Sequence, residues 1–138
     1  MVNDDAWNTV WDPNFKNTLI DLEDIRKTAA AAIADPEKFN GREVELIGDR
    51  VGVKESLDLI AAVAGKKITM QRYGENEVTR LRRENPRLGG QWIKRELSKL
   101  ESDYETRPLD DFRLGFKSFK DFLEQNEDLV VVTYRDIK

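Results

Sequence analysis

The sequence predicts an α/β protein in which helices pack on a parallel sheet, and three observations support this class. Between residues 18 and 73 the apolar segments follow the order strand, helix, strand, helix, strand, which is typical of parallel strands joined by helices. Cap residues and glycines mark the ends of these helices. At 138 residues, of which 39% are hydrophobic, the chain has the length of one domain with a lean core.

The N-terminal segment carries three aromatic side chains, Trp7, Trp11 and Phe15. The two tryptophans are four residues apart, as on one face of a helix, until an Asp-Pro pair interrupts the pattern. A short strand is expected next, from Leu19 to Asp21.

The first strong helix is predicted to begin after Asp21 and to end near Ala34. Asp21 is a good N-cap, and Asp24 follows at the position of a capping-box acid. Pro36 disfavours the α conformation at the preceding residue and so ends the helix. Capping and the helix dipole together explain the acidic group of Asp21, Glu23 and Asp24. One helical face carries an apolar stripe that we expect to be a packing surface: Leu22, Ile25, Ala29 and Ile33.

A strand, a helix and a second strand are predicted next. The helix begins near Val53, and Gly65 stands where a left-handed C-cap belongs. The second strand is expected from Lys67 to Tyr73. The first strand carries Val44, Leu46 and Ile47, and the stripe of the helix consists of Val53, Leu57, Ile60, Ala61 and Ala64.

From residue 74 onward the pattern is more helical, with a linker expected at Pro108 and a strand predicted for the run LVVVTY at 129–134. The first helix is predicted from Glu75 to Asn85, with Val78 and Leu81 inward, and Pro86 ends it. The second is predicted from Gly90 to Asp103, and its apolar face consists of Trp92, Ile93, Leu97 and Leu100. The third follows Ser118, with Asp121 as the capping acid and with Phe119, Phe122 and Leu123 as its apolar residues.

The composition excludes several classes of function. The chain has no cysteine and no histidine, which removes disulfides, thiolate nucleophiles and Ser-His dyads and leaves no support for a metal site. The net charge of -4 argues against a general polyanion binder. No apolar run has membrane-spanning length and the first residues do not resemble a signal peptide, so we expect a cytoplasmic protein without a membrane partner.

Two runs of sequence point to a family. They are IDLEDIRKTAAAAIADPEKFNGREVELIGD, with AGKKI after the next helix, and FKSFKDFLEQN near the end. They resemble the C-terminal half of the NmrA-like proteins, atypical members of the short-chain dehydrogenase/reductase superfamily, over residues 7–126. The chain departs from the family at Arg26, where a small residue is usual, and at Gly52, where Ser or Thr usually caps the second helix.

The resemblance implies a division of the chain. Residues 1–73 would be the C-terminal half of a Rossmann-like α/β unit with a parallel sheet. Residues 74–138 would form a helical substrate-side region with a short C-terminal strand.

Family members bind NADP or NAD on a Rossmann domain; some are reductases, and others are redox-sensing regulators that bind transcription factors. A glycine-rich turn after the first strand holds the pyrophosphate. None of the eight glycines here forms G-x-x-G-x-x-G or G-x-G-x-x-G, so we predict no cofactor-binding residues and no cofactor in this chain alone. Gly89 and Gly90 follow a proline and are interpreted as a turn between helices.

No catalytic residue is predicted. The Tyr-x-x-x-Lys spacing of the superfamily occurs once, at Tyr134 and Lys138, in a strand-like run at the last residue, and we interpret it as chance. Trp7, Trp11 and Phe15 either line a substrate cleft, because the family's C-terminal portion covers the nicotinamide end of the site, or anchor the core.

The stretch from Arg72 to Lys99 is basic and contains Tyr73 and Trp92. It either holds nucleic acid or an anionic ligand by charge and stacking, or pairs with the glutamates interspersed in it. We expect the pairing, and no nucleic-acid partner.

Three functions remain open. The first is an NmrA-like protein without the cofactor loop, truncated or non-catalytic, with no reductase activity of its own because the segment that would hold the cofactor is absent. The second is a redox-related regulatory or protein-interaction module. A sheet without its first strands presents an open edge, which favours a homo-oligomer or a protein partner, and LVVVTY could supply the pairing. The third is an incomplete gene product without a selected function.

Overall fold

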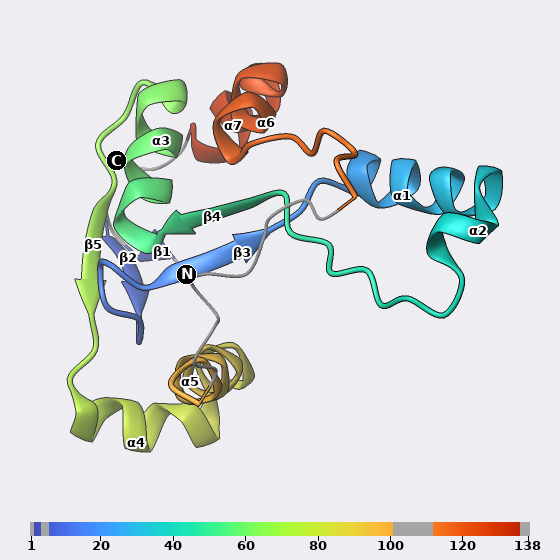
Figure 1. Cartoon of the computed structure of the whole chain (residues 1–138). Helices are drawn as coiled ribbons and strands as arrows, with labels where there is room; N and C mark the ends of the chain where they lie inside the picture. Colours follow the sequence, from blue (N-terminus) through green and yellow to red (C-terminus); the bar gives the residue numbers. More distant parts are fainter. Residues whose placement is uncertain (1, 4–5, 101–111, 136–138) are drawn as a thin grey trace.

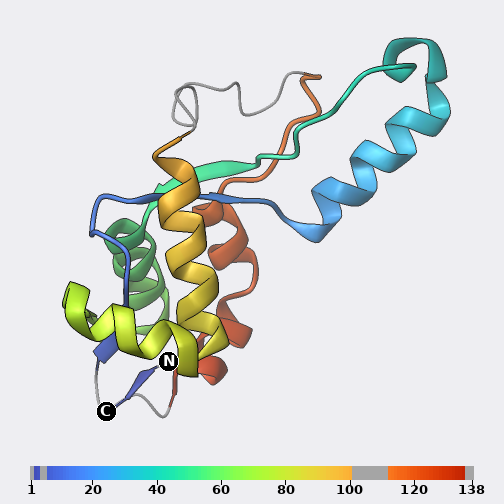
Figure 2. The ribbon, with the colours of Figure 1, turned by 90° about the horizontal axis from the view of Figure 1, so that it is seen from below.

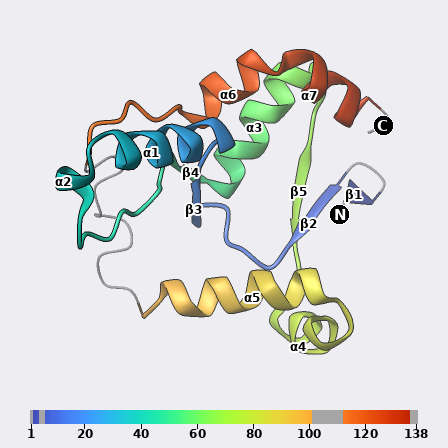
Figure 3. The same cartoon turned by 90° about the vertical axis from the view of Figure 1, so that its right-hand side faces the viewer.

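The computed structural model is a mixed α/β fold and describes residues 2–3, 6–100 and 112–135 (Figure 1). The linker expected at Pro108 lies outside these residues. The strands are β1 (Val2–Asn3), β2 (Ala6–Thr9), β3 (Lys16–Leu19), β4 (Asp49–Gly52) and β5 (Thr69–Arg72). The helices are α1 (Leu22–Ala34), α2 (Pro36–Phe39), α3 (Val53–Ala64), α4 (Glu75–Glu84), α5 (Pro86–Ser98), α6 (Phe119–Gln125) and α7 (Glu127–Tyr134). Figure 3 shows α3, α6 and α7 on one side of the strands and α4 and α5 on the other.

One sheet contains the strands β1, β2 and β5, in the order β1-β2-β5. β2 pairs with β1 in the antiparallel direction and with β5 in the parallel direction, with Trp7 opposite Met70. Parallel pairing is therefore present, but it joins the N-terminal strand to the strand after α3. β5 ends the strand order, and Figure 1 shows it at the left border of the fold.

β3 and β4 form a second sheet, an antiparallel pair in which Leu19 lies opposite Asp49. The strand expected over residues 44–47 is wrong, because these residues have no regular structure, although Ile47 is buried. A strand needs a neighbour for its backbone groups. β3 lies alongside this part of the chain only from Gly48, whose N–H donates to the Leu19 carbonyl at 2.8 Å.

Helix α1 begins and ends where the sequence predicts. The Asp21 side chain caps it by accepting a hydrogen bond from the Glu23 N–H at 3.2 Å, and the helix ends at Ala34, ahead of Pro36. The strand expected from Leu19 to Asp21 comes earlier, as β3, because Asp21 serves as the cap. Figures 1 and 2 show α1 and α2 projecting together from the rest of the fold.

The segment from 112 to 118 holds this projecting pair of helices. Phe39 of α2 stacks on Phe112, with ring centroids 4.6 Å apart, and the Lys38 ammonium donates to the Phe112 carbonyl at 3.3 Å. The Asp24 carboxylate of α1 accepts from the Lys117 N–H at 2.7 Å. α1 and α2 are therefore packed on a C-terminal segment and not on a sheet.

Helix α3 has both of its predicted ends. Gly52 is the N-cap, and the Glu55 carboxylate accepts from the Gly52 N–H at 3.3 Å. Gly65 adopts φ 66°, the left-handed C-cap that glycine favours. The helix buries Val53 and Leu57 and packs against α6 and α7.

Helices α4 and α5 meet at Asn85. α4 ends before Pro86, as predicted, but α5 begins at Pro86, earlier than the expected start at Gly90. The Asn85 side chain caps α5 by accepting from the Arg87 N–H at 3.0 Å. Gly89 and Gly90 therefore lie inside α5, and their interpretation as a turn is wrong.

A buried cluster closes the end of β2. It contains Val10, which is the residue that follows β2, together with Val78 from α4 and Leu88 from α5. The close approach of α4 and α5 requires a glycine at position 89, where a Cβ would lie 2.9 Å from the Arg82 carbonyl oxygen.

The C-terminal region confirms one prediction and contradicts another. The Ser118 hydroxyl caps α6 by accepting from the Asp121 N–H at 3.1 Å, as predicted. The strand expected at 129–134 is wrong, because this run belongs to helix α7 and pairs with no strand of the described residues. Val130 is buried while Val132 is exposed, which is a helical and not a strand pattern. Packing of α7 against α3 overrides the β propensity of the run.

Candidate functional site

The three aromatic side chains predicted to bind substrate, Trp7, Trp11 and Phe15, lie side by side, and we call them the aromatic row. The Trp7 and Trp11 rings have centroids 6.2 Å apart, and Phe15 stacks on Trp11 at 5.5 Å with an interplanar angle of 11°. Each ring is partly buried.

The helical interpretation of the tryptophan spacing is wrong. Trp7 belongs to strand β2 and Trp11 to the bend after it. A turn then reverses the chain, and the Phe15 N–H donates to the Asp12 carbonyl at 3.0 Å. The turn, and not a helix, brings the third ring onto the second.

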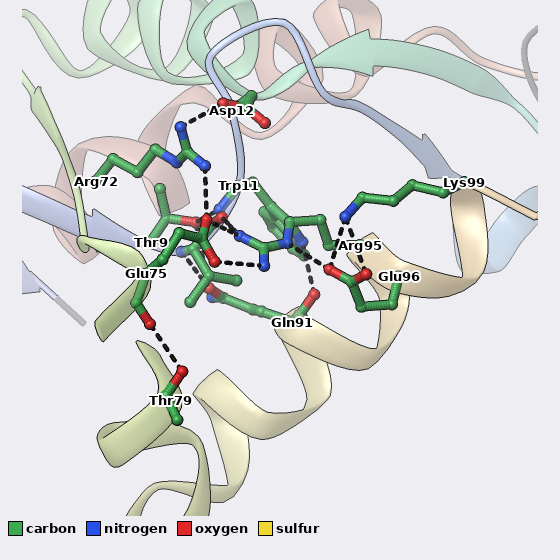
Figure 4. Close-up of polar contacts among 11 residues, drawn as sticks. Thr9, Trp11, Asp12, Arg72, Glu75, Thr79, Gln91, Arg95, Glu96 and Lys99 are labelled. Atoms are coloured by element: carbon green, nitrogen blue, oxygen red, sulfur yellow. Dashed lines mark hydrogen bonds and ion pairs between the residues drawn. The ribbon is translucent and has the colours of Figure 1, made fainter. Parts of the chain in front are cut away.

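Gln91 of helix α5 fixes Trp11, the middle ring of the row (Figure 4). The Trp11 indole N–H donates to the Gln91 carbonyl at 2.9 Å. The Gln91 side-chain oxygen accepts from the Thr9 hydroxyl at 3.2 Å and from the Val10 N–H at 3.3 Å. Because its indole and backbone N–H groups both have acceptors, Trp11, the middle ring of the row, is held in one geometry.

Arg95 lies next to Gln91 in a network of charges. Its Nη1 donates to the Val10 carbonyl at 3.1 Å, and its two terminal nitrogens contact the Glu75 carboxylate. Its Nε donates to Glu96 at 3.1 Å. The hydrogen bond from Arg95 lowers the pKa of Glu75 below its ordinary value. This network holds the end of β2 to α4 and α5.

The basic stretch from Arg72 to Lys99 shows the pairing that the interspersed glutamates predict. Arg80 pairs with Glu84 at 3.2 Å, and the Arg82 guanidinium lies 4.0 Å from the centroid of the Trp92 ring. Other pairs join Arg72 to Asp12 and Glu75, Arg95 to Glu75 and Glu96, and Lys99 to Glu96. The absence of a nucleic-acid partner stays a prediction.

Lys94 differs from these neighbours. Its ammonium lies 6.0 Å from the centroid of the Trp11 ring, and the side chain is half-buried. Burial lowers the pKa of Lys94 below its ordinary value. None of the ion pairs between residues that the structure describes includes Lys94.

A second candidate site lies where α1 begins, and we call it the junction pocket. It is an open hollow of about 250 Å³ with mainly apolar walls. The Lys117 ammonium reaches Asp21 at 2.5 Å, and this hydrogen bond lowers the pKa of Asp21 and raises the pKa of Lys117. The pocket is lined by Leu19, Ile20, Asp21, Leu22, Asp49, Lys117, Ser118, Phe119 and Phe122.

Capping explains only part of the acidic group formed by Asp21, Glu23 and Asp24 at the start of α1. Asp21 is a cap, as predicted, but Asp24 is completely buried and accepts from the Lys117 N–H and from the Lys27 ammonium, at 2.7 and 2.8 Å. Asp24 therefore attaches the C-terminal segment to α1. The signal for this role is the presence of a second polar residue, Thr28, on the same helical face, where it is buried as well.

The apolar stripe of α1 does not pack as expected. Leu22 is 69% exposed and Ile33 is 83% exposed, and Ala29 between them is exposed too. These three residues lie within about 40° of one another around the helix. Leu22 also lines the junction pocket, so the first residue of the stripe borders the pocket.

Helix α5 also presents an apolar face to the outside. The face expected to pack carries Ile93 and Leu97, which are both more than half exposed, with Leu100 just beyond the helix. The buried face instead carries Leu88 and Arg95, because α5 approaches β2 through the charge network.

The remaining sequence candidates form no site that the structure describes. Tyr134 lies on α7, and Lys138 is outside the described residues, so the interpretation of their spacing as chance stays a prediction. Over residues 2–3, 6–100 and 112–135, no group of acidic residues could hold a metal ion. Within the same ranges, each helix is too short or too polar to cross a membrane.

Comparison with known proteins gives no relative. No family model, curated protein or solved structure matches the chain.

Proposed function

We propose that this chain is a non-catalytic interaction module of NmrA-like descent that acts together with a partner chain. The observation that carries the proposal is the orientation of α1. The helix buries Asp24 and Thr28 and exposes Leu22, Ala29 and Ile33.

An apolar stripe directed to solvent is unfavourable for a helix, because each exposed aliphatic side chain loses about 1.5 to 3 kcal/mol of burial free energy. Large contiguous apolar surfaces on soluble chains usually mark interaction sites. Leu22, the first residue of the stripe, borders the junction pocket, and such a hollow suits an apolar side chain of a partner. Arg26 lies on the same face and pairs with Glu23. A partner that covers this face must therefore also place a polar or acidic group against the Arg26 guanidinium.

The free edge of β5 supports the same function. β5 ends its sheet, and its outward backbone groups pair with no other strand of the described chain. An extended segment of a partner can add to such an edge by main-chain hydrogen bonds. The partner surface that we propose thus combines a strand edge with a helical stripe.

The NmrA-like descent rests on the residue runs quoted above and on two features that agree with it. These features are the mixed α/β class and the parallel pairing of β2 with β5. A Rossmann-like origin belongs to this proposal, although the described strands combine this parallel pair with two antiparallel pairs. The sequence contains no glycine-rich cofactor loop, so we expect no NADPH binding by the chain alone. Titration calorimetry that showed low-micromolar NADPH binding would contradict the non-catalytic assignment.

Association is tested with a charge-neutral pair of substitutions, Leu22→Asp and Ile33→Lys. Each new charge suits its place, because an acid is favourable in the first turn of a helix and a base in the last. The matched control is Ala30→Lys, which places a charge on the same helix but outside the stripe. Light scattering at increasing concentration measures self-association, and quantitative co-purification of the tagged chain measures binding to a different protein.

We expect the wild type and Ala30→Lys to associate and the double variant not to. Equal recovery of partners by all three chains would contradict the proposal. A monomer at every concentration, with no partner that depends on Leu22 and Ile33, would contradict it as well.

A further inference from the structure

The aromatic row and Lys94 have features of a ligand site that the proposed docking function does not use. The three rings come from β2 and the turn after it, and Lys94 comes from α5. They meet at Trp11, whose ring centroid lies 5.5 Å from that of Phe15 and 6.0 Å from the Lys94 ammonium.

Trp11, the middle ring of the row, is held in place before any ligand arrives, and the other two rings pack on it. The Trp11 indole N–H is held by the Gln91 carbonyl at 2.9 Å, and the Trp11 backbone N–H donates to the Thr9 hydroxyl at 3.1 Å (Figure 4). Thr9 itself is completely buried. A preorganised aromatic surface binds a planar ring without the cost of ordering its own side chains.

Lys94 supplies a charge that the described chain does not neutralise. The next residue, Arg95, has Glu75 and Glu96, and Lys99 has Glu96, whereas no described carboxylate pairs with Lys94. A half-buried ammonium without a counter-ion is unfavourable, because it has lost part of its hydration and gained no ionic contact. An anion that reaches Lys94 restores that contact.

We infer that the aromatic row and Lys94 form a binding site for a small molecule that combines a planar ring with an anionic group such as a carboxylate. The ring lies against Trp7, Trp11 and Phe15, and the anion contacts the Lys94 ammonium. The cation over the Trp11 face and the stacked rings act on one ligand from two elements, β2 and α5.

The test compares 2-naphthoate with 2-naphthamide, which share the ring and differ in charge. Indole N–H resonances of the 15N-labelled protein report the location of binding. Trp7 and Trp11 lie in the proposed site, while Trp92 lies against Arg82 and serves as an internal control. We expect saturable shifts of Trp7 and Trp11 with a Kd of about 1 mM or tighter for naphthoate, and little shift of Trp92.

Three variants identify the role of each group. Lys94→Gln should weaken naphthoate binding about tenfold, the loss of one charge-assisted contact, and leave naphthamide binding unchanged. Lys94→Arg should retain most of the affinity, and Lys99→Gln, with the same charge change five residues further along, should have no effect. Phe15→Leu should weaken both ligands.

Three outcomes would overturn the inference. They are equal affinity of the acid and the amide, equal affinity of Lys94→Gln and the wild type, and shifts that are as large at Trp92 as at Trp11. The α1 stripe plays no part in this test, so the ligand site and the proposed docking function succeed or fail separately.

Discussion

Arg95 and Glu75 form a two-pronged ion pair, with Nη1 and Nη2 at 3.0 and 3.1 Å from the two carboxylate oxygens. The partners differ in their surroundings, because the Arg95 side chain is 8% exposed and the Glu75 side chain is 64% exposed. Removing Arg95 leaves a carboxylate that water can hydrate, whereas removing Glu75 leaves a buried cation with Glu96 as its remaining partner. The same guanidinium holds the Val10 carbonyl, so the pair joins β2 to α4 and α5.

The packing of the Arg95 side chain is expected to matter more than its charge. Arg95→Ala removes a buried stem and leaves the Val10 carbonyl without its donor, which should lower the free energy of unfolding by about 2 to 4 kcal/mol. Arg95→Met retains most of the volume and should cost about half as much. Urea denaturation measures both, and equal losses would show that the ionic contact stabilises the fold more than the packing does.

The Glu75 carboxylate should make stability depend on pH. The hydrogen bond from Arg95 lowers the pKa of Glu75 in the folded state, so the unfolded chain binds this proton more readily. The contribution is therefore present above the unfolded-state pKa and is lost as the pH falls through the folded-state pKa. We expect Glu75→Gln to be less stable than the wild type near neutral pH, by a modest amount because Glu75 is exposed. Urea melts in acid should show the two proteins converge, and a constant difference would contradict the assignment.

Two adjacent glycines in α5 should respond in opposite ways to alanine. Gly89→Ala places a Cβ 2.9 Å from the Arg82 carbonyl oxygen and should destabilise the contact of α4 with α5. Gly90→Ala meets no atom within 4 Å and should stabilise the helix by up to about 1 kcal/mol, the difference in helix propensity. Thermal unfolding of the two variants provides the measurement. If both variants were stabilised, α4 and α5 would not be this close.

Val130 and Val132 distinguish a C-terminal helix from a strand. In a strand the two side chains share a face, whereas in α7 Val130 is buried and Val132 is 58% exposed. Val130→Ala should therefore cost about 1 to 3 kcal/mol, and Val132→Ala about 0.5 kcal/mol or less. Similar losses at both positions, measured by denaturation, would favour the strand.

The buried Asp24 carboxylate should be the acidic group that stabilises the attachment of α1 and α2 to the segment from 112 to 118. Asp24→Ala leaves the Lys117 N–H without its acceptor and should cost about 1 to 3 kcal/mol. Glu23→Ala, one residue earlier and exposed, is the control and should change stability little. Hydrogen exchange at the Lys117 amide adds a local measurement, because its protection should fall in the first variant only.

Helix ends were predictable because capping is local. Asp21, Gly52, Gly65 and Ser118 form their capping hydrogen bonds with groups within a few residues of themselves, and each has the predicted role. The start of α5 was missed although its signal is equally local. Asn85 followed by Pro86 is a cap and a first helical residue, and the two glycines after them obscured it.

Parts of the candidate sites were predictable only as residue types. The aromatic row was identified from Trp7, Trp11 and Phe15, but its arrangement depends on a turn and on Gln91, which is distant in sequence. Lys94 had no local signal, because its lack of a counter-ion among the described residues is visible only when the neighbouring pairs are known.

The sequence by itself determined the mixed α/β class, the caps of α1, α3 and α6, and the aromatic residues that form the row. The tertiary structure alone decided that residues 44–47 form no strand, that 129–134 is helical, and that the stripe of α1 is exposed. The physical reason is the range of the interactions. A cap satisfies its hydrogen bonds within one turn, whereas a strand or a buried face exists only where a distant part of the chain lies against it.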